Sequence, residues 1–118
     1  MKLAIVGSRS LTDYTKFKAI LLTNIFTKED IKVDTIISGG ASGVDRMAAR
    51  FARENNIPLI EYIPDWNKNG KAAGFMRNKD IINNADIVLA VWDGVSKGTQ
   101  HSINLTQKAN KHLIIQQY

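Results

Sequence analysis

The stretch TIISGGASGVD, residues 35–45, carries the main fold signal of this 118-residue chain. Its first four residues form an apolar run typical of a buried strand, and Gly39-Gly40 ends that run. Residues 44–52 then place apolar side chains at helical intervals. The sequence therefore predicts a strand, a glycine turn and a helix in direct succession.

The same strand-then-helix order recurs along the whole chain. Strands are predicted at residues 3–6, 35–38, 58–63, 87–92 and 113–116, and helices at residues 14–28, from 44 up to Asn55-Asn56, 72–84 and 99–110, with Thr12 or Asp13 as the first N-cap and a loop at residues 65–70. Because the strands are apolar along their length, we expect a mainly parallel, five-stranded sheet covered by helices on both faces. The fold class is α/β, a three-layer sandwich, in a single domain spanning residues 1–118.

Composition excludes several kinds of site. The chain has no cysteine, which excludes disulfides, thiolate metal ligands and a cysteine nucleophile. His101 and His112 lie far apart on different predicted elements, so no metal site and no cofactor are expected. Sixteen Lys and Arg against eleven Asp and Glu give a net charge of +5, which suits an anionic partner.

The sequence has neither a long apolar segment nor a secretory signal. We therefore expect a cytoplasmic protein without a membrane partner.

Four unusual turns follow the first four predicted strands. They are GSR (7–9), SGGASGVD (38–45), PDW (64–66) and WDGVSKGT (92–99). Ligands bind beyond the carboxyl ends of the strands in an open parallel sheet, so these turns predict one shared site. Glycines in such turns allow close approach of a ligand, and helix amides behind them can hold an anion. Neither the Walker motif G-x-x-x-x-G-K-S/T nor G-x-G-x-x-G is present.

The candidate ligand-binding residues come from these turns and from the segment GKAAGFMRN (70–78). They are Gly7, Ser8, Arg9, Ser38, Gly39, Gly40, Gly43, Asp45, Trp66, Lys71, Arg77, Asn78, Asp93, Lys97, Gly98 and Thr99. Arg9 offers a planar, bidentate cation to a phosphate or carboxylate.

Several of these residues have a purely structural alternative. Arg9 could pair with Asp13 or Asp45 and only shape its loop, and Thr99 could serve as an N-cap. Asp45 either interacts with a helix dipole or accepts hydrogen bonds from ribose hydroxyls. Trp66 is either a core aromatic or a base-stacking residue.

These blocks, in this order and over nearly the whole chain, resemble the SLOG superfamily. This Rossmann-like group includes the LOG phosphoribohydrolases and the DNA-processing protein DprA, and the match is to its small stand-alone YspA-like type. The resemblance implies a Rossmann-like fold and a nucleotide or nucleotide-derived ligand, with the glycine turn and the GT turn around phosphate or ribose. It also implies a homodimer or a higher homo-oligomer.

The LOG enzymes carry the motif P-G-G-x-G-T-x-x-E, whose Glu is catalytic. Gly98 and Thr99 match that motif, whereas Ser102 stands at the Glu position. Arg77 matches the LOG arginine, and Asn78 replaces the basic residue after it. Glycosidic hydrolysis typically needs a carboxylate, so Asp45 or Asp93 would have to supply it.

The leading hypothesis is a protein that binds a small nucleotide, ADP-ribose-like or a cyclic signalling nucleotide, as a sensor or a ligand-sequestering module. One alternative is an N-glycosidic hydrolase of nucleoside monophosphates. A second alternative is DprA-like binding of single-stranded DNA. That alternative is motivated by the net positive charge and by residues 66–79, which contain four basic residues and no acidic one.

Overall fold

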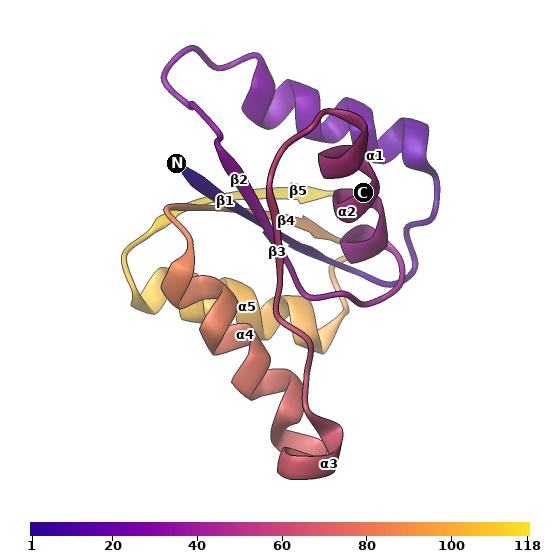
Figure 1. Cartoon of the computed structure of the whole chain (residues 1–118), viewed down its shortest axis with the longest axis vertical. Helices are drawn as coiled ribbons and strands as arrows, with labels where there is room; N and C mark the ends of the chain where they lie inside the picture. The colour runs from indigo at the N-terminus through magenta and orange to yellow at the C-terminus, as the bar shows by residue number, and fades with distance from the viewer.

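The computed structural model describes residues 1–118 and contains one five-stranded sheet (Figure 1). The strands lie in the order β3-β2-β1-β4-β5, and every neighbouring pair is parallel. Their bounds are β1 Lys2–Gly7, β2 Thr35–Ser38, β3 Leu59–Glu61, β4 Ile87–Trp92 and β5 His112–Gln117. The predicted α/β Rossmann-like fold is confirmed, and the sheet is parallel throughout.

Two pairs of helices cover the two faces of the sheet (Figure 1). Helices α1 (Tyr14–Leu21) and α2 (Val44–Glu54) lie on one face, and α4 (Ala73–Asn84) and α5 (Lys97–Lys108) lie on the other. The central strand β1 divides its side chains between them, as its alternating geometry requires. Leu3 and Ile5 join the core under α1 and α2, while Ala4 and Val6 join the core under α4 and α5.

The predicted loop at residues 65–70 is wrong. A short helix, α3, spans Trp66–Asn69, and a 3₁₀ turn, η2, spans Gly70–Ala72. Asp65 caps α3, because its carboxylate accepts a hydrogen bond from the Lys68 amide at 3.0 Å. No residue of α3 is buried, so the segment lacks the apolar periodicity by which a helix is recognised in sequence.

Other boundaries differ in smaller ways. Strand β3 is shorter than the predicted 58–63. It is an edge strand, and Pro58 before it has no N–H to donate to the sheet. The first predicted helix, 14–28, changes to a π-helix, η1, at Leu22–Phe26, and its N-cap is Asp13. Helix α5 begins at Lys97, two residues before the predicted start. None of the helices is both long and apolar enough to cross a membrane.

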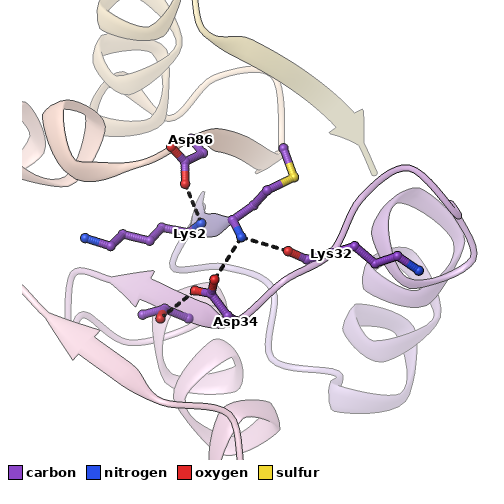
Figure 2. Close-up of polar contacts among 6 residues, drawn as sticks. Lys2, Lys32, Asp34 and Asp86 are labelled. Carbon is purple, nitrogen blue, oxygen red and sulfur yellow. Dashed lines mark hydrogen bonds and ion pairs between the residues drawn. The ribbon is translucent and has the colours of Figure 1, made fainter.

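The amino ends of β1, β2 and β4 are joined by polar contacts, shown in Figure 2. The Met1 amino group donates to the Lys32 carbonyl at 2.8 Å and to Asp34 Oδ2 at 3.0 Å. The Lys2 amide donates to Asp86 Oδ2 at 2.7 Å, so Asp86 ties the turn before β4 to the start of β1. These contacts fix the edge of the sheet opposite to the one where the four unusual turns lie.

Candidate functional site

A cleft of about 410 Å³ opens at the carboxyl ends of β1 and β4. The strand order reverses between these two strands, since β2 lies on one side of β1 and β4 on the other. Such a switch point is where open α/β sheets bind ligands. Eight of the predicted site residues line the cleft, namely Gly7, Arg9, Asp45, Arg77, Asn78, Asp93, Gly98 and Thr99.

In the GSR turn, only Arg9 presents its side chain to the cleft. Gly7 is required by packing, because a Cβ there would lie 2.5 Å from the Val91 carbonyl oxygen. Ser8 is buried, and its hydroxyl accepts a hydrogen bond from the Asp93 amide at 3.1 Å. Neither of the two ion pairs in the structure involves Arg9, so the alternative in which it pairs with Asp13 or Asp45 is wrong. Arg9 is therefore an exposed residue that lines the cleft and makes no ion pair, although its charge is one of those that lower the pKa of Asp45.

Of the SGGASGVD turn, Ala41 and Asp45 line the cleft, whereas Gly43 packs against the GSR turn. Gly43 has φ of 72°, and a Cβ on it would lie 2.6 Å from the carbonyl oxygens of Ser8 and Arg9. The Val44 amide also donates to the Ser8 carbonyl at 3.2 Å. Gly43 thus lets α2 begin directly against the backbone of the GSR turn.

The side chains of Asp45 and Arg77 both lie next to Gly39, because a Cβ there would be 2.9 Å from Asp45 Oδ2 and 2.5 Å from Arg77 Nη1. Asp45 is 8% exposed, and its Oδ2 accepts from the Ala41 amide at 3.1 Å. Burial raises the pKa of the Asp45 carboxyl above its ordinary value, although the Ala41 amide and Arg77 oppose that rise. Arg77 donates from Nη1 to the Gly39 carbonyl and from Nε to Asn78 Oδ1, and burial lowers its pKa. The cleft wall therefore holds a buried carboxyl beside a fixed guanidinium.

Asp93 shapes the loop that leads into α5. Its Oδ1 accepts from the amides of Val95 at 2.9 Å and Ser96 at 2.8 Å, and its Oδ2 accepts from the Ser10 hydroxyl at 3.3 Å. These two amides are the main reason that the pKa of Asp93 lies below its ordinary value. Both oxygens already have protein partners.

The amino end of α5 is open toward the cleft. No side-chain hydrogen bond caps it, and the amides of Lys97, Gly98 and Thr99 donate to no protein group. Thr99 is 4% exposed and lies inside the helix, so the alternative that made it the N-cap is wrong, and the N-cap is Ser96. A Cβ on Gly98 would meet no atom within 4 Å. The first turn of α5 thus offers free donors to a ligand in the cleft.

A sequence model of the YspA, cpYpsA-related SLOG family matches residues 1–69 of this chain. The chain belongs to this SLOG family. Among solved structures, it is similar to DNA processing protein A from Helicobacter pylori, whose structure addresses that protein's single-stranded DNA binding mode. The two chains are 27% identical, with a TM-score of 0.69. No curated protein matches the sequence.

The similarity to DNA processing protein A covers 98% of the SLOG chain and 64% of the other protein. The SLOG chain thus spans less than two thirds of that protein's length.

The remaining predicted site residues of this SLOG chain lie outside the cleft. Ser38 is buried, and its hydroxyl donates to the Asp45 carbonyl at 3.2 Å. Gly39 and Gly40 face side chains, those of Arg77 and Ile63 respectively. The others that do not line it are Ser8, Gly43, Trp66, Lys71 and Lys97. Ser8, Ser38 and the three glycines are packed against neighbouring groups, whereas Trp66, Lys71 and Lys97 are exposed.

Trp66 is neither in the core nor in the cleft. It is 53% exposed on α3, and its Cη2 would lie 3.5 Å from a Cβ on Gly74. The indole ring therefore packs over the first turn of α4, and its interpretation as a core aromatic is wrong.

Sequence reasoning missed several residues that line the cleft of the SLOG chain. Ser10 and Ser96 contribute hydroxyls, and Val6 and Ile81 contribute apolar surface. Ser10 directly follows GSR, and Ser96 directly precedes α5, so their positions in the unusual turns could have indicated them. Ser102, which stands where the LOG motif has Glu, also lines the cleft and is 2% exposed.

Proposed function

We propose that the cleft binds a small nucleotide whose phosphate lies at the amino end of α5. The observation that carries this proposal is the set of three free amides at Lys97, Gly98 and Thr99 beside the cleft. A helix amino end carries partial positive charge and unpaired N–H donors, and it favours an anion. Arg9, exposed and without an ion-pair partner, adds a full positive charge at the same cleft.

The amino end of α2 suits a different part of the ligand. Asp45 occupies the first turn of α2, and it lines the cleft. A carboxylate accepts hydrogen bonds, so Asp45 suits the ribose hydroxyls of the same nucleotide. The cleft volume of about 410 Å³ lies within the range typical of small-molecule sites.

The arrangement of carboxylates favours binding over hydrolysis. Ser102 cannot replace the LOG carboxylate, and both oxygens of Asp93 hold the loop before α5. Asp45 is then the one candidate for proton transfer at the cleft, since its pKa is raised. We accordingly propose a sensor or ligand-sequestering module formed by residues 1–118 as one domain.

Calorimetric titration with adenosine 5′-monophosphate, ADP-ribose and cyclic nucleotides tests the proposal. Replacing Arg9 with Ala should weaken binding by about ten-fold or more, as expected for the loss of a hydrogen bond to a charged group. Thr99→Ala keeps the backbone amide that the proposal uses, so it should leave the affinity nearly unchanged. Arg53→Ala is the matched control, because it removes the same charge from an exposed position in the last turn of α2. Binding of no nucleotide, or unchanged affinity in Arg9→Ala, would contradict the proposal, and release of free base with turnover would show an enzyme.

Single-stranded nucleic acid is a second candidate ligand, favoured by the similarity to DNA processing protein A. The segment from Trp66 to Lys79 supports it, because this segment has four basic residues and no acidic one. Such binding would weaken steeply with salt, because condensed counterions are released from the strand. A labelled oligonucleotide that fails to bind at low salt would exclude this candidate.

A further inference from the structure

A second groove of about 300 Å³ lies on the other side of the first turn of α5. We call it the α5 groove, and its walls are formed by Phe75, Trp92, Val95, Lys97, Gln100 and His101. Helices α4 and α5, which supply most of these residues, lie side by side on one face of the sheet (Figure 1). The nucleotide proposed for the cleft does not occupy this groove.

The α5 groove has a fixed aromatic wall. Phe75 is 51% exposed, and its ring centroid lies 4.5 Å from that of His101. Trp92 is held in place by the hydrogen bond that its indole N–H donates to the Ser96 carbonyl at 3.1 Å. An exposed Phe ring backed by ordered aromatic neighbours offers a planar surface on which a nucleobase can stack.

Charge around the α5 groove favours an anionic ligand. None of the eight residues that line it is acidic, and Lys97 adds a positive charge. Burial and nearby Lys79 lower the pKa of His101, which keeps the imidazole neutral and able to stack at neutral pH. A base that carries a phosphate therefore meets both a ring surface and a cation in this groove.

The cleft and the α5 groove are separated only by the amino end of α5. Gly98 and Thr99 line the cleft, while Lys97 and His101, on the same turns, line the groove. Asn78 joins the two sites, because it lines the cleft and its Nδ2 lies 3.2 Å from His101 Nδ1. The space around Gly98 is open, and a helix is about 10 Å across, so a short linear ligand can cross this end of the helix.

We propose that the α5 groove is a stacking subsite for the other base of a linear dinucleotide. In this arrangement the 3′ nucleoside occupies the cleft, its 5′-phosphate, which is the phosphodiester, lies at the free amides of α5, and the base of the 5′ nucleotide stacks on Phe75. The inference rests on the proposed nucleotide binding in the cleft, and it names a dinucleotide as the ligand class.

Three probes separate this inference from nucleotide binding itself. They are adenosine 5′-monophosphate, the 5′-phosphorylated dinucleotide pApA, and the same dinucleotide with an abasic 5′ sugar. We expect pApA to bind about ten-fold more tightly than either other probe, within the range that one stacked base contributes. Phe75→Ala should remove this advantage and leave the affinity for the monophosphate unchanged.

Two further variants complete the test. Met76→Ala is the matched control, because Met76 is 47% exposed, neighbours Phe75 on α4 and does not line the groove. Val95→Glu, at a side chain 79% exposed, adds a repelling charge to the groove without disturbing the core, and it should also remove the advantage of pApA. Equal affinity for pApA and its abasic form, or an advantage that survives both Phe75→Ala and Val95→Glu, would overturn the inference. Binding of none of the three probes would overturn the proposed function as well.

Discussion

Replacing Gly43 with Ala tests why the glycine turn contains glycine. The new Cβ would lie 2.6 Å from three backbone atoms of the GSR turn, at Ser8 and Arg9. These atoms cannot move independently, because the Val44 amide already donates to the Ser8 carbonyl at 3.2 Å. In addition, φ of 72° and ψ of −127° place Gly43 in a region that L side chains rarely adopt.

The expected cost of Gly43→Ala follows from these two effects. Backbone strain of this kind costs about 1–3 kcal/mol, and overpacking costs a further amount of about 1–3 kcal/mol. Together they would remove about 2–6 kcal/mol of a total free energy of unfolding that is typically about 5–15 kcal/mol. Urea denaturation followed by circular dichroism measures this loss.

Gly74→Ala is the matched control for this prediction. A Cβ on Gly74 would lie 3.5 Å from Trp66 Cη2, an ordinary contact, so the helical position should gain up to about 1 kcal/mol. A Gly43→Ala variant as stable as the wild type but with weaker nucleotide binding would refute the reasoning. That result would mean that Gly43 serves the approach of a ligand and not the packing of the two turns.

Three other changes test the site and the fold. Gly39→Ala would place a Cβ 2.5 Å from Arg77 Nη1 and 2.9 Å from Asp45 Oδ2, both on residues that line the cleft, so we expect nucleotide affinity to fall about ten-fold; unchanged affinity would contradict contact of these two side chains with the ligand. Lys111→Met removes three hydrogen bonds from Nζ to carbonyls at the end of α4, the shortest 2.6 Å, and should cost about 1.5–3 kcal/mol in the same assay. Asp45→Asn tests the raised pKa of Asp45. Because the folded state holds the proton of Asp45 more tightly than the unfolded state does, the free energy of unfolding of the wild type, compared with that of the variant, is highest below about pH 4. The variant should gain on the wild type as the pH rises through the pKa of the folded state, whereas a stability difference that does not depend on pH would be evidence against burial as the cause.

The fold was predictable because its main signals are local. Apolar runs such as residues 87–92 predict buried strands, and their alternation with helices leads to a parallel sheet. Residues 65–72 were not predictable, because α3 and η2 are stabilised by the cap at Asp65 and not by buried side chains. The π-helix at Leu22–Phe26 carries the same apolar spacing as an ordinary helix, so sequence alone did not separate the two.

The location of the candidate site was predictable from the sequence. Which residues of the turns line the cleft and which serve packing was not predictable. Residues after β1 and β4 do converge on one cleft, as the rule for parallel sheets requires. Sequence cannot tell a glycine that admits a ligand from one that admits a neighbouring backbone, and Gly43 is of the second kind. It also cannot tell which side of α5 a residue faces, and Lys97 lies in the α5 groove instead of the cleft.

Backbone amide chemical shifts, followed by nuclear magnetic resonance during titration with adenosine 5′-monophosphate, test the central claim most directly. The account predicts that the largest changes fall on the amides of Gly98 and Thr99, whose N–H groups are free at the amino end of α5. Inorganic phosphate should shift the same amides more weakly. Changes confined to the amino end of α2, or no saturable change at α5, would contradict the account.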